Sequence, residues 1–83
     1  KARVRLNEVN IDNIYSERDE LIHLRLTVDA NGTVISATKL PKTSTTDQIM
    51  INQVIAAVRS QVKYSKGNKT EQYFYTVKVN GKG

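Results

Sequence analysis

The chain has 83 residues, of which 39% are hydrophobic and 25% charged, and its formal net charge at pH 7 is +5. These values are ordinary for one small folded domain and exclude an intrinsically disordered chain. Because the sequence holds no cysteine, disulfides, thiolate metal sites and a cysteine nucleophile are excluded. The 13 lysines and arginines are spread along the chain, whereas a nucleic-acid-binding surface usually concentrates them.

The first 20 residues carry the weakest pattern. Val4 and Leu6 alternate with basic residues, which predicts a short strand over residues 2–6 followed by loop. The sequence begins with lysine rather than methionine, so we expect it to be a piece of a longer protein. No apolar run approaches the ~18 residues of a membrane-spanning helix. Because the pattern is weak up to residue 20 and clear after it, we divide the chain into a lead-in segment, residues 1–20, and a domain, residues 21–81.

The clearest strand pattern lies in LIHLRLTV, residues 21–28. Every second side chain is apolar over four positions, which predicts a strand with one buried face. Asp29 and Gly32 then give the residue types of a bulged hairpin turn. The run TVISATKL returns as a second strand. Pairing Asp29 with Thr33 predicts these opposite pairs: Val28 with Val34, Leu26 with Ser36, and Ile22 with Leu40, leaving Ile35 and Ala37 on the other face.

A helix is predicted between PKTSTTDQ and SKGNK. Thr45 with Gln48 three residues later has the pattern of a capping box, and Asp47 suits the positive end of the helix dipole. An apolar stripe follows at helical spacing: Ile51, Val54, Ile55, Val58 and Val62. Because every residue of this stripe is β-branched, the helix depends on a sheet to pack against rather than on intrinsic propensity.

The chain ends on a third strand, QYFYTVKVN, residues 72–80. One face carries Tyr73, Tyr75, Val77 and Val79, and the other carries Gln72, Phe74, Thr76 and Lys78. The first face is predicted to pack under the helix. The element order predicts an α+β fold, β-β-α-β, in which a three-stranded antiparallel sheet has one long helix on one face. The strand over residues 21–28 is predicted to be central, and the stretch at residues 2–6 is an additional short strand.

Residues for catalysis are missing from the sequence pattern. His23 is the only histidine, and no metal-ligating or acid–base partner lies at a recognisable spacing from it. Neither a G-x-S-x-G elbow nor a glycine-rich phosphate loop occurs. We therefore predict no enzyme, no catalytic residue, no cofactor, no metal and no small-molecule substrate.

Three motifs, in order, carry a family resemblance. They are Val28-Asp29-x-x-Gly32-x-Val34 after the first long strand, Ala57-Val58-Arg59 with Tyr64 after the helix, and Lys78-Val79-Asn80-Gly81 at the end. Over residues 20–81 the chain resembles the C-terminal domain of TonB-family energy transducers, in the version common in Bacteroidetes-type bacteria. A TolA-like domain of the cell envelope is a related reading.

The resemblance implies a periplasmic protein-docking domain, anchored upstream in the inner membrane, that couples inner-membrane energy to transport. Its partner would be an outer-membrane TonB-dependent transporter, whose N-proximal segment adds as a strand (β-augmentation). Upstream regions would contact inner-membrane proton-channel proteins. The contact maps onto the last strand: Gln72, Tyr73, Phe74, Tyr75, Thr76, Val77, Lys78, Val79 and Asn80. Family members often carry a Tyr-Pro pair in front of the first strand, but no proline follows Tyr15, so contacts of the N-terminal segment are not implied.

Other functions stay open at this point. A small α+β nucleic-acid-binding module is one alternative, but Phe74 is the only aromatic left for the open face of the sheet, and we expect no nucleic acid partner. A TonB-like interaction domain fused to a sensor or other envelope protein is another, and a domain that forms a homodimer or acts as a spacer, with no ligand, is a third. The stretch at residues 2–6 matters for all docking readings, because it would block the edge of the last strand if it lay along it.

Overall fold

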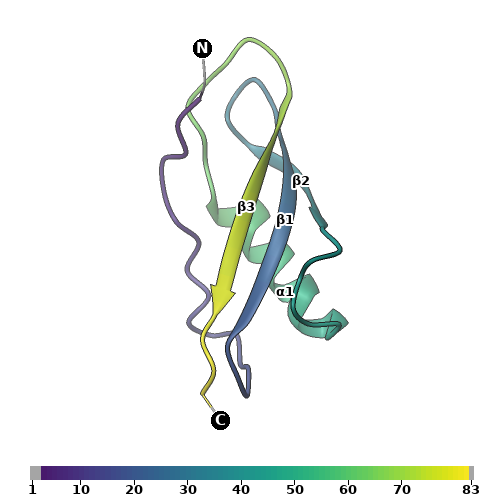
Figure 1. Cartoon of the computed structure of the whole chain (residues 1–83). Helices are drawn as coiled ribbons and strands as arrows, with labels where there is room; N and C mark the ends of the chain where they lie inside the picture. The colour runs from purple at the N-terminus through teal and green to yellow at the C-terminus, as the bar shows by residue number, and fades with distance from the viewer. Residues whose placement is uncertain (1–2, 83) are drawn as a thin grey trace.

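The computed structural model describes residues 3–82. Within them lie three strands and one helix: β1 (Glu20–Val28), β2 (Val34–Lys39), α1 (Gln48–Gln61) and β3 (Glu71–Val79). The strands form an antiparallel sheet in the order β2-β1-β3, and α1 lies across one face of it (Figure 1). The predicted α+β fold and the central position of the first long strand are confirmed. No helix of the described part is long and apolar enough to cross a membrane.

The core lies between the sheet and α1, as the two periodicities predict. Alternate side chains of β1 are fully buried, and the predicted helix stripe meets them, except that Ile55 is only half-buried. Met50, which lies next to the stripe, joins the core at 6% exposure. The buried aliphatic side chains shared by sheet and helix are Ile22, Leu24, Leu26, Val28, Ile51, Val54, Val58 and Val62.

A bulge in the β1–β2 hairpin corrects the predicted register. Val28 lies opposite Val34, as expected, but the register shifts between Thr27 and Val28, because one extra residue of β2 is left without a partner. Leu26 therefore lies opposite Ala37 rather than Ser36, and Ala37 packs against the core instead of the opposite face. The same shift corrects the expected Ile22–Leu40 pair, since the Leu40 N–H donates to the His23 carbonyl at 2.8 Å.

Gly32 closes the hairpin in a conformation that favours glycine. Its φ is +92°, and a Cβ built there would lie 2.0 Å from the Tyr64 carbonyl oxygen. Gly32→Ala is expected to cost at least about 2 kcal/mol of unfolding free energy, through left-handed strain plus displacement of that backbone. Asn31→Ala is the matched control in the same turn, and it should change stability by less than about 0.5 kcal/mol. Urea denaturation of both variants checks this, and equal losses would contradict it.

Both ends of α1 differ from the expected ones. The N-cap is Asp47, whose Oδ1 accepts from the Met50 N–H at 3.1 Å, because Asp47 has extended backbone. Thr45 instead accepts from the Asp47 N–H at 3.0 Å, so the capping box predicted at Thr45 is wrong. The helix ends at Gln61, before SKGNK, since Val62 is already extended. Residues 63 and 64 then form isolated β-bridges.

An N-terminal strap, residues 3–14, packs against Tyr75 of β3 on the same face of the sheet as α1. Figure 1 shows it running beside β3. It pairs with the segment that follows the helix: the Leu6 N–H donates to the Lys63 carbonyl, and the Ser65 N–H donates to the Val4 carbonyl, both at 2.8 Å. Ile14 is 4% exposed and belongs to the core. The strand expected over residues 2–6 begins outside the described residues, and from residue 3 on it amounts to a single bridge, Arg5 with Tyr64.

Candidate functional site: the open edge of strand β3

The direction of each backbone group of β3 follows from the ladder on the other side of β1. The His23 carbonyl accepts from the Leu40 N–H, and the His23 N–H donates to Thr43 Oγ1 at 3.0 Å, so His23 bonds away from β3. Since alternate residues of an antiparallel strand bond to opposite neighbours, the even-numbered residues of β1 bond to β3. Their partners are the odd-numbered residues of β3. The N–H and C=O groups of Gln72, Phe74, Thr76 and Lys78 therefore point outward.

These four residues form the outward edge, and the strap that runs beside β3 (Figure 1) does not pair with it. No backbone group of the four makes a hydrogen bond outside the β1–β3 ladder. The strap does not occupy this edge, because its backbone pairs with residues 63–65. Asn80 lies beyond β3, and the chain after it is tied back by the Gly81 N–H, which donates to Asp19 Oδ1 at 2.8 Å. Residues 72–78 therefore present a row of backbone donors and acceptors to which an extended segment of another chain can bind.

The side chains of the last strand divide by face as predicted. Tyr75, Val77 and Val79 are buried, and Tyr73 is half-buried and stacks on Tyr64 with ring centroids 5.0 Å apart. Phe74, in contrast, is 76% exposed on the other face. The aromatic side chains under the helix and strap belong to the core, so a partner at this strand meets backbone groups and the side chains of the outward edge.

Two polar contacts mark the outward edge. Thr76 Oγ1 lies 2.9 Å from His23 Nδ1 across the strand pair. Lys78 Nζ lies 3.6 Å from Asp19 Oδ2, and the Gly81 N–H and the Lys78 charge together lower the pKa of Asp19. A lysine on an edge strand disfavours unwanted strand pairing. Lys78 therefore disfavours pairing at this end of the outward edge, and the part from Gln72 to Thr76 remains available.

Arg3 anchors the strap to the start of β3, which the sequence did not predict. Its side chain is 3% exposed and its Nε lies 3.0 Å from Glu71 Oε1. Its Nη1 donates to the Asp29 carbonyl at 2.6 Å, and its Nη2 donates to the Lys69 carbonyl. Hydrogen bonds from the Tyr73 hydroxyl and from Arg3 lower the pKa of Glu71. One guanidinium thus joins the strap, the hairpin turn and the loop in front of β3.

In the strap a basic side chain faces the sheet and apolar side chains face solvent, which is the reverse of an ordinary surface strand. Arg5 faces the sheet, with its guanidinium carbon 4.7 Å from the Tyr75 ring centroid, while Val4 and Leu6 are each 62% exposed. The Tyr75 hydroxyl donates to Glu8 Oε1 at 3.0 Å. Alternation alone gives the period of such a segment but not which face turns inward, and the inward face here is set by hydrogen-bond acceptors rather than by burial of apolar side chains.

Four carboxyl groups make the folded state sensitive to acid. The pKa is lowered for Glu8, Asp19, Glu20 and Glu71, chiefly by hydrogen bonds from Arg5, Gly81, Ser44 and Tyr73 respectively. Because the folded-state pKa is the lower one, their contribution is complete well above the ordinary values of 4.5 and 3.8 and is lost as pH falls through the folded pKa. Thermal unfolding should therefore give a constant Tm at pH 6–8 and a falling Tm below pH ~4.5. A Tm that rises on acidification would contradict these contacts.

The sequence predicted no metal site, and the arrangement of possible metal ligands in the structure bears on that expectation. No group of three or more histidine, aspartate or glutamate side chains within residues 3–82 is arranged to hold a metal ion. His23 is half-buried on the open face of the sheet and contacts a threonine hydroxyl.

Compared with protein-family models, with curated proteins and with solved structures, the chain matches none.

Proposed function

We propose that this chain is a protein-docking domain that binds an extended segment of a partner by adding it as a fourth strand beside β3. The observation that carries the proposal is the outward edge, whose backbone groups have no hydrogen-bond partner within residues 3–82. Strand addition uses such groups for affinity and the alternating side chains for specificity.

The other edge of the sheet is a poorer candidate. β2 has six residues and contains the bulge, and Pro41 follows soon after it. Short, bulged strands that end near a proline resist strand addition. β3 has nine residues with continuous pairing to β1, so it presents the longer and more regular template.

The family resemblance of the sequence gives this docking a biological setting. On that basis the chain is the periplasmic domain of a TonB-like energy transducer in the cell envelope, with its anchor in the inner membrane. The partner is then the N-proximal segment of an outer-membrane transporter, and docking couples inner-membrane energy to uptake. Proton-channel proteins of the inner membrane would act on parts of the protein upstream of this domain.

Hydrogen exchange of single amides tests the proposal. In the chain alone, the amides of Phe74 and Thr76 should exchange fast, while those of Tyr75 and Val77 should be protected by the ladder to β1. Adding synthetic peptides from the N-termini of outer-membrane transporters should protect the even-numbered amides and leave the odd-numbered ones unchanged. No protection with any peptide, or protection along β2 instead, would contradict the proposal.

A further inference from the structure

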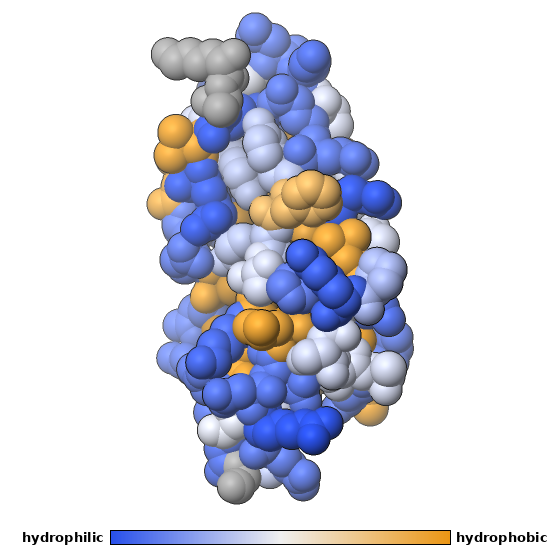
Figure 2. Space-filling model, in the orientation of Figure 1, coloured by the Kyte–Doolittle hydropathy of each residue, from blue (hydrophilic) through white to orange (hydrophobic). Residues whose placement is uncertain are grey.

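A pocket opens on the sheet face opposite α1, next to the outward edge. It encloses about 420 Å³, and its lining residues are His23, Leu24, Leu40, Pro41, Lys42, Phe74, Tyr75 and Thr76. The hairpin bulge creates it, since the register shift brings Leu40 beside His23. Figure 2 shows hydrophobic side chains on this face of the sheet with hydrophilic ones around them. An apolar pocket beside a phenylalanine that is 76% exposed is a feature that a partner commonly covers.

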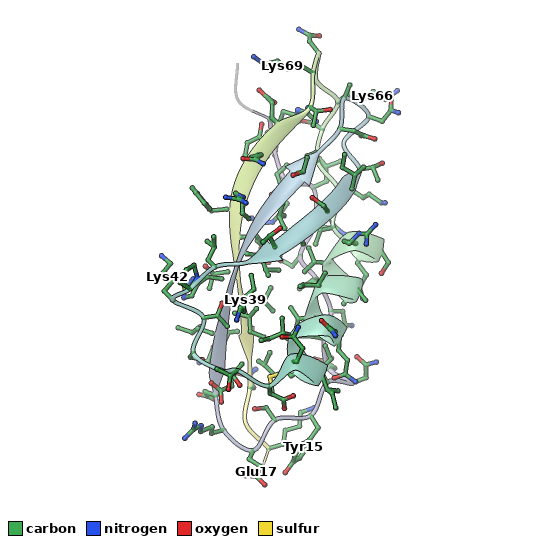
Figure 3. All side chains as sticks on the ribbon, turned by 90° about the vertical axis from the view of Figure 1, so that its right-hand side faces the viewer. Tyr15, Glu17, Lys39, Lys42, Lys66 and Lys69 are labelled. Carbon is green, nitrogen blue, oxygen red and sulfur yellow. The ribbon has the colours of Figure 1, made fainter. Side chains whose placement is uncertain are left out.

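The charges around the pocket are of one sign. Lys42 lines it and lies on the side of the sheet away from α1 (Figure 3). Arg25 lies opposite Phe74 in the strand pair, and Lys78 follows two residues after Thr76 on the same face. Within residues 3–82 the strands put no acidic side chain on this face, and Asp19 lies at its end against Lys78. A second copy of this chain would bring like charges together, whereas an acidic partner complements them.

We propose that this pocket takes a bulky apolar side chain of an acidic peptide segment, which gives the strand-adding site its sequence specificity. This inference rests on the proposed function. In an added strand, alternate side chains lie on the open face beside Phe74, Thr76 and Lys78. Thr76 is the shortest of the four side chains of the outward edge, so a leucine or phenylalanine opposite it reaches over Thr76 toward His23. Carboxylates of the same segment then lie near Lys42, Arg25 and Lys78.

A matched peptide set and one surface variant test the proposal. The probes are synthetic ten-residue peptides of β-branched and polar residues with either three aspartates or three asparagines, and with either leucine or alanine at the central position. The acidic leucine peptide should bind the whole chain at least about tenfold more tightly than its alanine or its asparagine counterpart. Phe74→Ser should remove the leucine preference, and raising NaCl from about 0.05 M to about 0.5 M should remove most of the aspartate preference. Because Phe74 is exposed, the variant should stay folded, which circular dichroism checks.

The residues whose amides or rings change when a peptide binds separate this inference from the proposed function. Binding that perturbs the amides of the outward edge, with no change at the His23 and Phe74 rings and no preference for leucine, overturns the pocket and leaves strand addition standing. Ring perturbation without amide protection places the peptide side chain in the pocket but overturns strand addition, and with it the role of the pocket in a strand-adding site. A dimer that Phe74→Ser abolishes, or an oligothymidylate that binds more tightly than every peptide, overturns the acidic peptide as the occupant. No perturbation with any peptide overturns both proposals.

Discussion

Replacing Thr76 with proline is expected to abolish peptide binding while the domain remains folded. Proline removes the N–H of residue 76 and places its ring on the side where a fourth strand would lie. That N–H has no partner within residues 3–82, and prolines are tolerated where a strand N–H faces away from the sheet. We expect a loss of at most about 1–2 kcal/mol in stability and a loss of at least about 30-fold in affinity, since the hydrogen bonds of several neighbouring residues depend on the same register.

Val77→Pro is the matched control, one residue further along. The Val77 N–H belongs to the ladder with Ile22, and its side chain is 4% exposed. Proline there breaks an interior hydrogen bond and shifts a core side chain, so the chain should unfold at 25 °C or lose more than about 3 kcal/mol. Circular dichroism and peptide titration of the two variants give the comparison. If Thr76→Pro unfolds as Val77→Pro does, the direction assigned to the outward edge is wrong.

The sequence predicted the sheet and its central strand because β1 and β3 each have a single buried face. Alternation in β1 and β3 leaves one register in which the buried side chains of both strands meet α1, and this also placed Phe74 on the open face. The turn residues predicted a bulge at Gly32, but the extra residue in β2, Ile35, was beyond reach of that reasoning, since it keeps a polar–apolar pattern on both sides of it. The pocket between Leu40 and Phe74 depends on that one residue and could not be predicted.

The outward edge was predictable only in part. A period of two separates the faces of β3, but it does not tell which backbone groups bond to β1. Which residues of β3 bond to β1 follows from the hydrogen-bond partners of His23. One of these partners, Thr43, lies in a loop, where a period of two does not apply. The strap was harder still. Its docking depends on Arg3 reaching carbonyl oxygens of the hairpin and of the loop in front of β3, and acceptors of the main chain leave no trace in residue types.

Replacing Arg3 with methionine is expected to lower the unfolding free energy by about 2–4 kcal/mol. Methionine keeps much of the volume of the arginine stem, so the loss reports on hydrogen bonds rather than on a cavity. Four acceptors lose a donor: Glu71, whose side chain is 33% exposed, and the carbonyls of Asp29, Ser65 and Lys69. Glu71 keeps the Tyr73 hydroxyl and the Asp29 carbonyl keeps the Gly32 N–H, so the loss is that of hydrogen bonds to a charged donor. Such bonds contribute about 1.5–3 kcal/mol each, and access of water to the acceptors reduces that amount. Tm should fall by roughly 10–25 °C for a domain of this size.

Two further variants assign the effect to its cause. Arg5→Met removes the other arginine of the strap, whose pair with Glu8 is largely exposed, and it should cost about 1 kcal/mol or less. Glu71→Gln keeps the geometry of an acceptor for Arg3 but removes its charge. If the carbonyls dominate, Glu71→Gln costs clearly less than Arg3→Met, and equal losses would instead assign the effect to the ion pair. Hydrogen exchange in Arg3→Met should rise most at the Leu6 and Ser65 amides, because the strap bonds to residues 63–65 and opens locally without Arg3. At Tyr75 and Val77 it should rise only by the factor that the loss of global stability sets.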